Sequence, residues 1–190
     1  MAVSKVVKQT RWYRKIHRWI ASILFVFFVI ISITGLLLGW KKNSNGYLLA
    51  DSQKGTTTDI SQWLSFDSLH TIAVKTLHDS IPEIISDKLD RIDARPEKGM
   101  VKFVFKENYL GIQLDASTGK LLHIEKRRSD FIENIHDGSY IDKLTGLNGA
   151  FKLSYTTIMG GALLMLTITG FWLWYNPKRI RKKKLNNTQM

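Results

Sequence analysis

The sequence predicts a membrane α-helical protein. Two transmembrane helices, with both chain termini in the cytoplasm, are expected to flank a small extracytoplasmic α+β domain of one helix and an antiparallel meander. Three observations predict this architecture. Two long runs of the chain carry no charged residue, Lys and Arg collect on the outer side of both runs, and every Asp and Glu lies between them.

The two uncharged runs are residues 19–40 and 153–175. A helix rises about 1.5 Å per residue, so a hydrocarbon core of about 30 Å requires about 20 residues, and each run is long enough. We therefore expect transmembrane helices at residues 19–40 and 152–175. The first run is longer than a secretory signal and ends without a small-residue cleavage pattern, so it is expected to be an uncleaved anchor.

The charge of the chain is unevenly distributed. Its 28 Lys and Arg exceed its 16 Asp and Glu, for a formal charge of +12. The excess lies in a basic arm, residues 1–18, and a basic tail, residues 176–190, whereas all acidic residues lie within 51–142. Lys and Arg next to a span mark the cytoplasmic side and attract anionic lipid. We therefore expect cytoplasmic termini, an extracytoplasmic segment 41–151 and a lipid bilayer, with no nucleic acid, as partner.

Several functional classes lack support in this sequence. The chain has no cysteine, which excludes disulfides, thiolate metal ligands and thiol nucleophiles within it. It also lacks a P-loop, a dinucleotide-binding fingerprint and the H-E-x-x-H motif. No catalytic residue is assigned.

The middle segment divides by composition. Residues 41–62 are rich in polar and turn-forming residues and are expected to be a linker. Residues 63–128 are expected to be the α+β domain. Its helix is predicted from apolar residues at helical spacing within 63–85, with Ser65 or Asp67 as the N-terminal cap. Three or four strands follow, and Val101, Phe103 and Phe105 are expected to share one face.

Residues 129–151 lead into the second span. Phe131, Ile132 and Ile135 would form one apolar face, so we expect an interfacial segment lying at the membrane surface.

The spans contain small residues and a repeated pattern. Gly35 and Gly39 form a G-x-x-x-G pattern that lets helices approach closely. With Gly160 and Gly161 it favours close helix packing, and a homodimer through Gly35 and Gly39 would form a four-helix bundle. The spans also end alike, in "ISITGLLLGW" and "LTITGFWLWY". Chance explains that likeness as well as an internal relationship does.

The chain has five histidines: His17, His70, His78, His123 and His136. His70 and His78 lack a third ligand and are expected on the surface of the predicted helix. His17 and His136 differ, because they flank the spans on opposite sides of the membrane. A histidine beside a membrane bundle is costly without a partner, and imidazole is a common ligand of haem iron. His17 is therefore either an interfacial cation or an iron ligand.

Three stretches of the chain together resemble a known family: "RKIHRWIASILFVFFVIISITGLLL", "GIQLDASTGKLLHI" and "IENIHDGSYIDKLTGLNGAF…LTITGFWLWYNPKR". They resemble the PepSY-associated transmembrane family of bacterial inner-membrane proteins, and the second stretch is similar to the end of a PepSY domain. The resemblance covers residues 11 to about 180 apart from the linker. It implies a PepSY-like fold for the extracytoplasmic domain, a bacterial inner (cytoplasmic) membrane and a periplasmic location for residues 41–151.

The resemblance also implies a cofactor. Larger members of the family are implicated in reducing ferric siderophores with membrane-embedded b-type haem. The matched positions are His17 and His136, the candidate metal ligands for haem b, and the neighbouring Arg14 and Arg18 could meet its propionates. The larger relatives have about twice as many spans as this chain. Bis-histidine ligation would therefore pair each histidine with its mate in a dimer, or with a different subunit.

Two functions follow from these expectations. In the first, a haem-binding dimer supports transmembrane electron transfer to periplasmic ferric chelates for iron uptake. If the chain is an enzyme, it is then an oxidoreductase of the ferric-siderophore reductase type. In the second, the spans tether a non-enzymatic PepSY module that regulates a peptidase. A role as accessory subunit of an envelope or iron-uptake complex stays open as well.

Overall fold

The computed structural model describes residues 2–81 and 86–188. They form two compact units, which we call the helical unit, Met1–Thr34 with Ile135–Met190, and the sheet unit, Gly35–Asn134. The helical unit contains most of α1 (Ala2–Gly39) together with α4 (Ser139–Thr145) and α5 (Ala150–Thr188). The short α3 (Arg128–His136) contributes its last residues to this unit.

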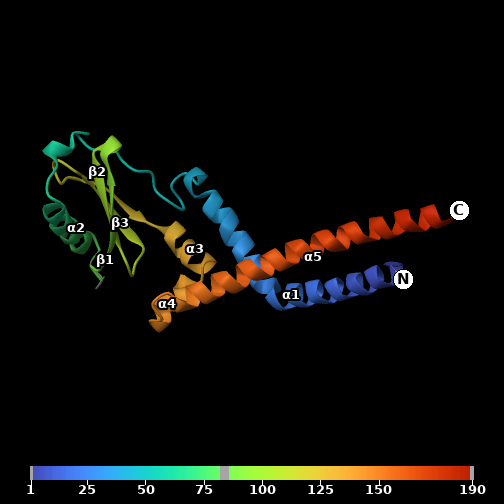
Figure 1. Ribbon diagram of the computed structural model, residues 1–190. Coiled ribbons are helices and arrows are strands. Elements are labelled where there is room, and N and C mark those ends of the chain that lie inside the picture. Colours follow the sequence, from blue (N-terminus) through green and yellow to red (C-terminus); the bar gives the residue numbers. More distant parts are fainter. Residues whose placement is uncertain (1, 82–85, 189–190) are drawn as a thin grey trace. The chain divides into compact units, whose positions relative to one another are not determined.

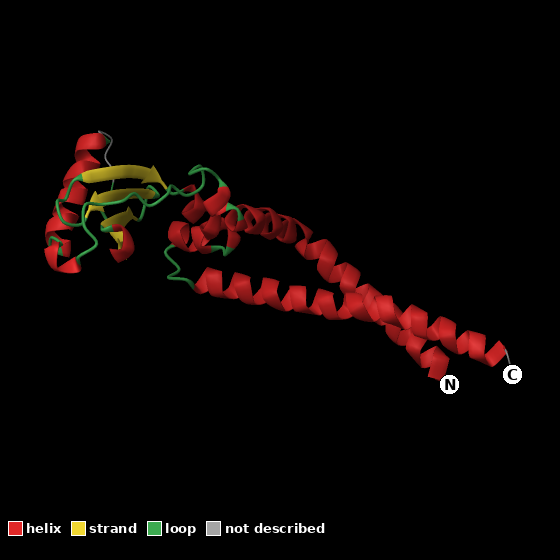
Figure 2. Ribbon diagram, turned by 90° about the horizontal axis from the view of Figure 1, so that it is seen from above, coloured by secondary structure: helices red, strands yellow, loops and turns green. Residues whose placement is uncertain are grey.

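Helices α1 and α5 lie side by side and antiparallel, so that the two chain termini are at the same end of the pair (Figures 1 and 2). Lys5–Gly39 and Ala150–Arg181 are long and apolar enough to cross a membrane. Only 6% and 11% of their most apolar windows are buried within the chain, unlike the core helix of a water-soluble protein. The two expected spans are therefore present as helices.

One narrow stripe of each long helix is shielded by the rest of the chain. On α5 the less exposed positions recur at alternating steps of four and three: 155, 159, 162, 166, 169, 173 and 176. On α1 the positions 6, 10, 13, 17, 20 and 24 follow the same rule. Such a heptad spacing is typical of a coiled-coil seam between two helices. The uniformly apolar sequence of the spans did not show which stripe this would be.

The sheet unit is an α+β domain, as expected. Its four strands are β1 (Leu89–Arg95), β2 (Met100–Phe105), β3 (Leu110–Asp115) and β4 (Leu121–Lys126). They form an antiparallel sheet in the order β1-β2-β3-β4. Helix α2 (Phe66–Ser80) is capped at its N-terminus by Ser65, whose side chain accepts a hydrogen bond from the Ser68 N–H. Three short 3-10 helices complete the unit: Lys41–Asn43, Ile60–Gln62 and Pro96–Lys98.

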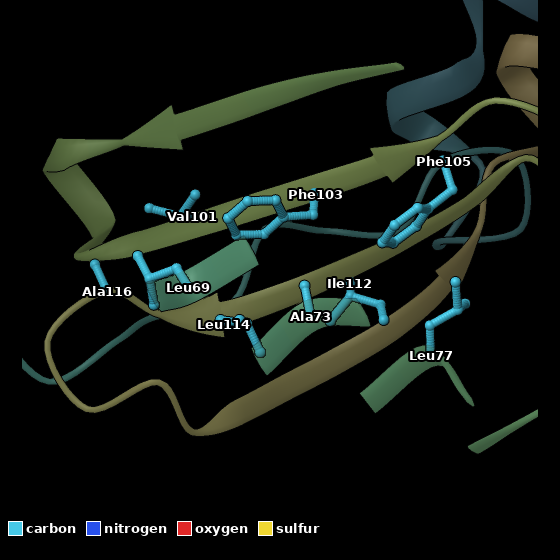
Figure 3. Packing of buried hydrophobic residues seen from close by; sticks show 9 residues of the cluster. All are labelled: Leu69, Ala73, Leu77, Val101, Phe103, Phe105, Ile112, Leu114 and Ala116. Carbon is cyan, nitrogen blue, oxygen red and sulfur yellow. The ribbon is translucent and has the colours of Figure 1, made fainter. Parts of the chain in front are cut away.

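The core of the sheet unit lies between α2 and one face of the sheet (Figure 3). Val101, Phe103 and Phe105 share this face, which confirms the alternation read from the sequence, and Phe103 is 0% exposed. The other members of the cluster are Leu69, Ala73, Leu77, Ile112, Leu114 and Ala116. Alternate strand residues point to the same side of a sheet, so this packing determines which residues face away from α2.

The opposite face of the sheet carries a buried charge cluster. The Glu125 carboxylate, fully buried, accepts hydrogen bonds from Arg127 Nη1 and Gln113 Nε2 and forms an ion pair with Lys102 Nζ, each at 2.8 Å. Arg127 also binds Asp130, at 2.7 Å. Burial alone would raise the pKa of Asp130, but hydrogen bonds and charge from Arg127 and Arg91 hold it below its ordinary value. Each buried charge therefore has a partner.

Residues 51–57, within the segment assigned to a linker, are hydrogen-bonded to this unit. Gln113 accepts from the Gln53 N–H at 2.8 Å and donates to the Asp51 carbonyl at 3.1 Å. Asp115 accepts from the Thr56 N–H at 2.7 Å and from its hydroxyl. A side chain at Gly55 would lie 2.0 Å from the Gly99 carbonyl oxygen, so the approach requires glycine. This segment is an ordered part of the domain.

Two expectations about single residues are corrected. His70 is not a free surface residue: its ring lies 5.8 Å from that of Phe103, and its Nε2 is buried without a partner among the described residues. Gly39, Gly160 and Gly161 do not mediate close helix packing within the chain, because a Cβ at any of them would have nothing within 4 Å.

Candidate functional site: histidine–threonine pairs in the helical unit

His17 lies in the seam between the two long helices. Its Nδ1 is 2.8 Å from the Thr169 hydroxyl oxygen of α5. Thr169 is 2% exposed, so this contact is shielded from the surroundings. A Cβ on Gly170 would be 3.6 Å from His17 Cε1, an ordinary contact distance. The histidine at the start of the first span therefore has a specific partner near the end of the second.

His136, at the end of α3, makes the corresponding contact with α1. Its Nδ1 is 2.8 Å from the hydroxyl oxygen of Thr34, which is 8% exposed. In both pairs the ring is half-buried, and Nε2 has no hydrogen-bond partner among the residues that the structure describes. Each histidine thus has one nitrogen in a hydrogen bond and one uncommitted nitrogen.

The two pairs are reciprocal and explain the repeated pattern of the spans. Thr34 and Thr169 are the threonines of the two Ile-Thr-Gly motifs. The motif of each span contacts the histidine that precedes the other span in the chain. The sequence showed both motifs but no role for them, because the contacts join positions 152 and 102 residues apart.

The turn after α3 holds His136 in place. Asp137 accepts from the Ser139 N–H at 2.9 Å and pairs with Lys152 Nζ at 2.5 Å. Burial alone would raise the pKa of Asp137, but the hydrogen bonds from Lys152 and Ser139 hold it below its ordinary value. Gly138 has φ +79°, and a Cβ there would lie 3.0–3.2 Å from the rings of Tyr155 and Phe151.

Helix α5 begins at Ala150, after the short α4 that follows this turn, and it is capped by a residue of α4. The Asp142 carboxylate accepts from the N–H groups of Phe151 and Lys152 at 2.9 and 2.8 Å. A carboxylate at a helix N-terminus satisfies free N–H groups and complements the helix dipole. The "IHDGSYID" stretch is therefore tied to the first turn of α5 at both Asp137 and Asp142, which positions His136 relative to the start of α5.

A third polar contact lies nearer the chain termini. Asn176 Nδ2 is 3.3 Å from Thr10 Oγ1, and Asn176 is 1% exposed. Asn176 Oδ1 and Trp172 Nε1 are buried without partners among the described residues. Sequence reasoning did not single out Thr10 or Asn176, because isolated polar residues at the ends of apolar runs are common.

Aromatic side chains lie close to both pairs. Tyr13 lies one turn from His17, and Trp172 lies one turn from Thr169. The ring centroids of Tyr13 and Trp172 are 5.9 Å apart. At the other end, Tyr155 stacks on Phe151 at 6.0 Å and meets Phe27 edge-on at 6.1 Å. Each histidine therefore has apolar, flat surfaces beside it.

Arg14 and Arg18, expected near His17, are exposed and make no hydrogen bond or ion pair with the described residues. Their positions leave both guanidinium groups available to an anionic group at this end of the helix pair.

The two histidines do not converge on one point. From His17 to Thr34, the partner of His136, α1 rises about 25 Å at 1.5 Å per residue. Among the described residues no group of three or more His, Cys, Asp or Glu is placed to hold a metal ion. His17 and His136 of one chain therefore cannot bind the same metal ion.

The chain was compared with known proteins. No curated protein matched, and no solved structure matched. The family model described as the PepSY-associated TM region matches residues 14–189, and both histidine–threonine pairs lie within that range. The chain therefore belongs to the PepSY-associated transmembrane family, as its motifs predicted.

Proposed function

We propose that this chain is a haem-binding membrane protein that supports electron transfer to ferric chelates in the periplasm. The observation that carries the proposal is the pair of histidines whose Nδ1 atoms are engaged by Thr169 and Thr34 while neither Nε2 has a hydrogen-bond partner among the described residues. A histidine ligand of a metal usually donates its other ring N–H to an oxygen in this way, which fixes its orientation.

The residues present fit a b-type haem better than a bare metal ion. One imidazole is an acceptable axial ligand for haem iron, whereas a structural zinc site needs four ligands. The aromatic pairs Tyr13–Trp172 and Phe151–Tyr155 offer apolar surfaces to a flat macrocycle. When bound, haem supplies one-electron redox chemistry. The chain itself would supply an imidazole nitrogen from His17 or His136, a low-dielectric setting and, through Arg14 and Arg18, cations for propionates.

The proposal includes a topology. With Lys and Arg on the terminal sides of both spans, His17 faces the cytoplasm and His136 the periplasm of a bacterial inner membrane. A second ligand for each iron would come from the same histidine of the other chain in a homodimer. Gly39, which has open space around it, and Gly35 would support that contact together with the similarly open Gly160 and Gly161.

The test is a reduced-minus-oxidised absorption spectrum of protein purified from haem-replete cells. Wild type should show b-type bands, His17→Ala and His136→Ala should each lose about half of the haem, and the double variant should lose all of it. His78→Ala, on the exposed side of α2, is the matched control and should bind normally. Wild-type protein without haem would overturn the proposal.

A peptidase-regulating or accessory role is the alternative, and the separate core of the sheet unit favours it. Replacing residues 48–129 with a flexible Gly/Ser linker separates the two functions. Under the haem proposal the spectrum should survive this replacement, because both histidine–threonine pairs lie in the helical unit. Under the alternative, every cellular phenotype should be lost with the sheet unit, while His17→Ala should have no effect.

A further inference from the structure

The hydroxyl protons of Thr34 and Thr169 are already committed to their own helices. Thr169 Oγ1 donates to the Met165 carbonyl at 2.7 Å, and Thr34 Oγ1 donates to the Ile30 carbonyl at 2.7 Å. Both contacts are the four-residue back-bond that threonine commonly makes inside a helix. A hydroxyl has a single proton. Each threonine therefore has only acceptor capacity left for its histidine.

That restriction selects one form of the neutral imidazole ring. If His17 carries its proton on Nδ1, it donates to Thr169 Oγ1 while Thr169 keeps its back-bond, which makes two hydrogen bonds. If the proton is on Nε2, Thr169 must give up the back-bond to donate to Nδ1, and only one remains. The described residues offer Nε2 no hydrogen-bond acceptor that would favour a proton there. The same count holds for His136 with Thr34.

We propose that Thr169 and Thr34 are positioning residues that hold His17 and His136 in the Nδ1–H tautomer, so that each Nε2 presents its lone pair. The role toward iron rests on the proposed function, but the tautomer follows from the protein alone. Because each threonine contacts only one of the two histidines, it should affect the tautomer of that histidine and leave the tautomer of the other unchanged.

The tautomer is tested without any cofactor. In haem-free, full-length protein in lipid nanodiscs with ¹⁵N-labelled histidine, the ring ¹⁵N shifts distinguish a protonated Nδ1 from a protonated Nε2. His17→Gln and His136→Gln assign the signals. We expect both rings as Nδ1–H in wild type. Either ring found with its proton on Nε2 would overturn the inference for that pair.

Paired variants provide the controls. Thr169→Val, which keeps the shape and removes the oxygen, should give a mixture of tautomers at His17 and no change at His136, and Thr34→Val should do the reverse. Thr169→Ser keeps the hydroxyl and should restore the wild-type pattern. Valine variants with unchanged shifts, or changes at both histidines from one substitution, would overturn the pairing.

Haem-bound protein allows a second measurement, of haem affinity and reduction potential. A hydrogen bond that an axial histidine donates from Nδ1 makes it a stronger ligand, and loss of such a partner typically weakens metal binding by about 10–100-fold. Thr169→Val should therefore weaken haem binding by about tenfold or more and raise the reduction potential of the His17 centre, with Thr169→Ser close to wild type. Unchanged haem affinity and potential in Thr169→Val would overturn the role toward iron. Wild-type protein that never binds haem would instead overturn the proposed function, and the ¹⁵N measurement would still decide the tautomer.

Discussion

The two units of this chain differ in which side chains they bury and which they expose. In the sheet unit the interior is apolar, with Leu69, Phe103 and Ile112 all at 0% exposure. In the helical unit large apolar side chains lie outside, for example Phe25 at 64% and Leu164 at 62%, while the buried positions include Thr10, Thr34, Thr169 and Asn176. A unit surrounded by water gains from burying apolar surface, whereas helices in lipid gain almost nothing from it. A few polar contacts therefore have an outsized influence on how the helical unit packs.

The largest test of this contrast is truncation of an apolar side chain in each unit. Phe103→Ala should destabilise the sheet unit by roughly 3–5 kcal/mol, because it removes buried surface and leaves a cavity. Leu164→Ala, on the exposed face of α5, should change stability little. Hydrogen exchange of strands β2 and β3, and of α5, measures both effects. Similar losses from the two truncations would contradict the contrast.

The second test removes a buried charge. Glu125→Gln should cost about 3 kcal/mol, since it leaves the buried Lys102 and Arg127 short of negative charge. Glu107→Gln, on the exposed loop between β2 and β3, is the matched control and should have almost no effect. Urea unfolding followed by hydrogen exchange of the sheet unit gives the difference. A loss below about 1 kcal/mol would show that the cluster is hydrated rather than buried.

A smaller effect on the stability of the sheet unit is expected when the pH is lowered. Burial alone would raise the pKa of Asp115, but hydrogen bonds from Thr56, Ser117 and Thr118 hold it well below its ordinary value. A lowered pKa stabilises the fold above the unfolded-state pKa, and that contribution is lost as the pH falls through the acidic range. The free energy of unfolding of the sheet unit should therefore decrease below about pH 4. Asp115→Asn should be less stable at neutral pH and should show a shallower decrease, and an identical pH slope would contradict this assignment.

The smallest effect is expected from a polar residue in the helical unit. Asn176→Leu removes a 3.3 Å hydrogen bond to Thr10 and a buried oxygen that has no partner among the described residues. Side-chain hydrogen bonds between membrane helices contribute on average about 0.6 kcal/mol, so the variant should match wild type to within about 1 kcal/mol. Unfolding in mixed micelles measures it, with Thr10→Val as the companion variant. A loss comparable to that of Glu125→Gln would mean that this contact organises the helix pair.

Much of the architecture was predictable from local patterns. Uncharged length predicted both spans, alternation placed Phe103 and its neighbours on one strand face, and Ser65 was among the expected caps of α2. These properties depend on residues near one another in the chain, so the sequence records them directly. The family motifs pointed in the same way to His17 and His136, although not to what those histidines contact.

Tertiary structure decided the rest. In a run where nearly every residue is apolar, no periodicity marks the buried positions, so the shielded positions of Thr34 and Thr169 could not be read from the spans themselves. The histidine–threonine contacts join positions 152 and 102 residues apart, and only the antiparallel pairing of α1 with α5 and the turn after α3 bring them together. By itself the sequence determined which segments are helices, which are strands and where two histidines stand at the ends of the spans. The fold decided their partners, because a hydrogen bond depends on distance in space and the chain order does not encode that distance.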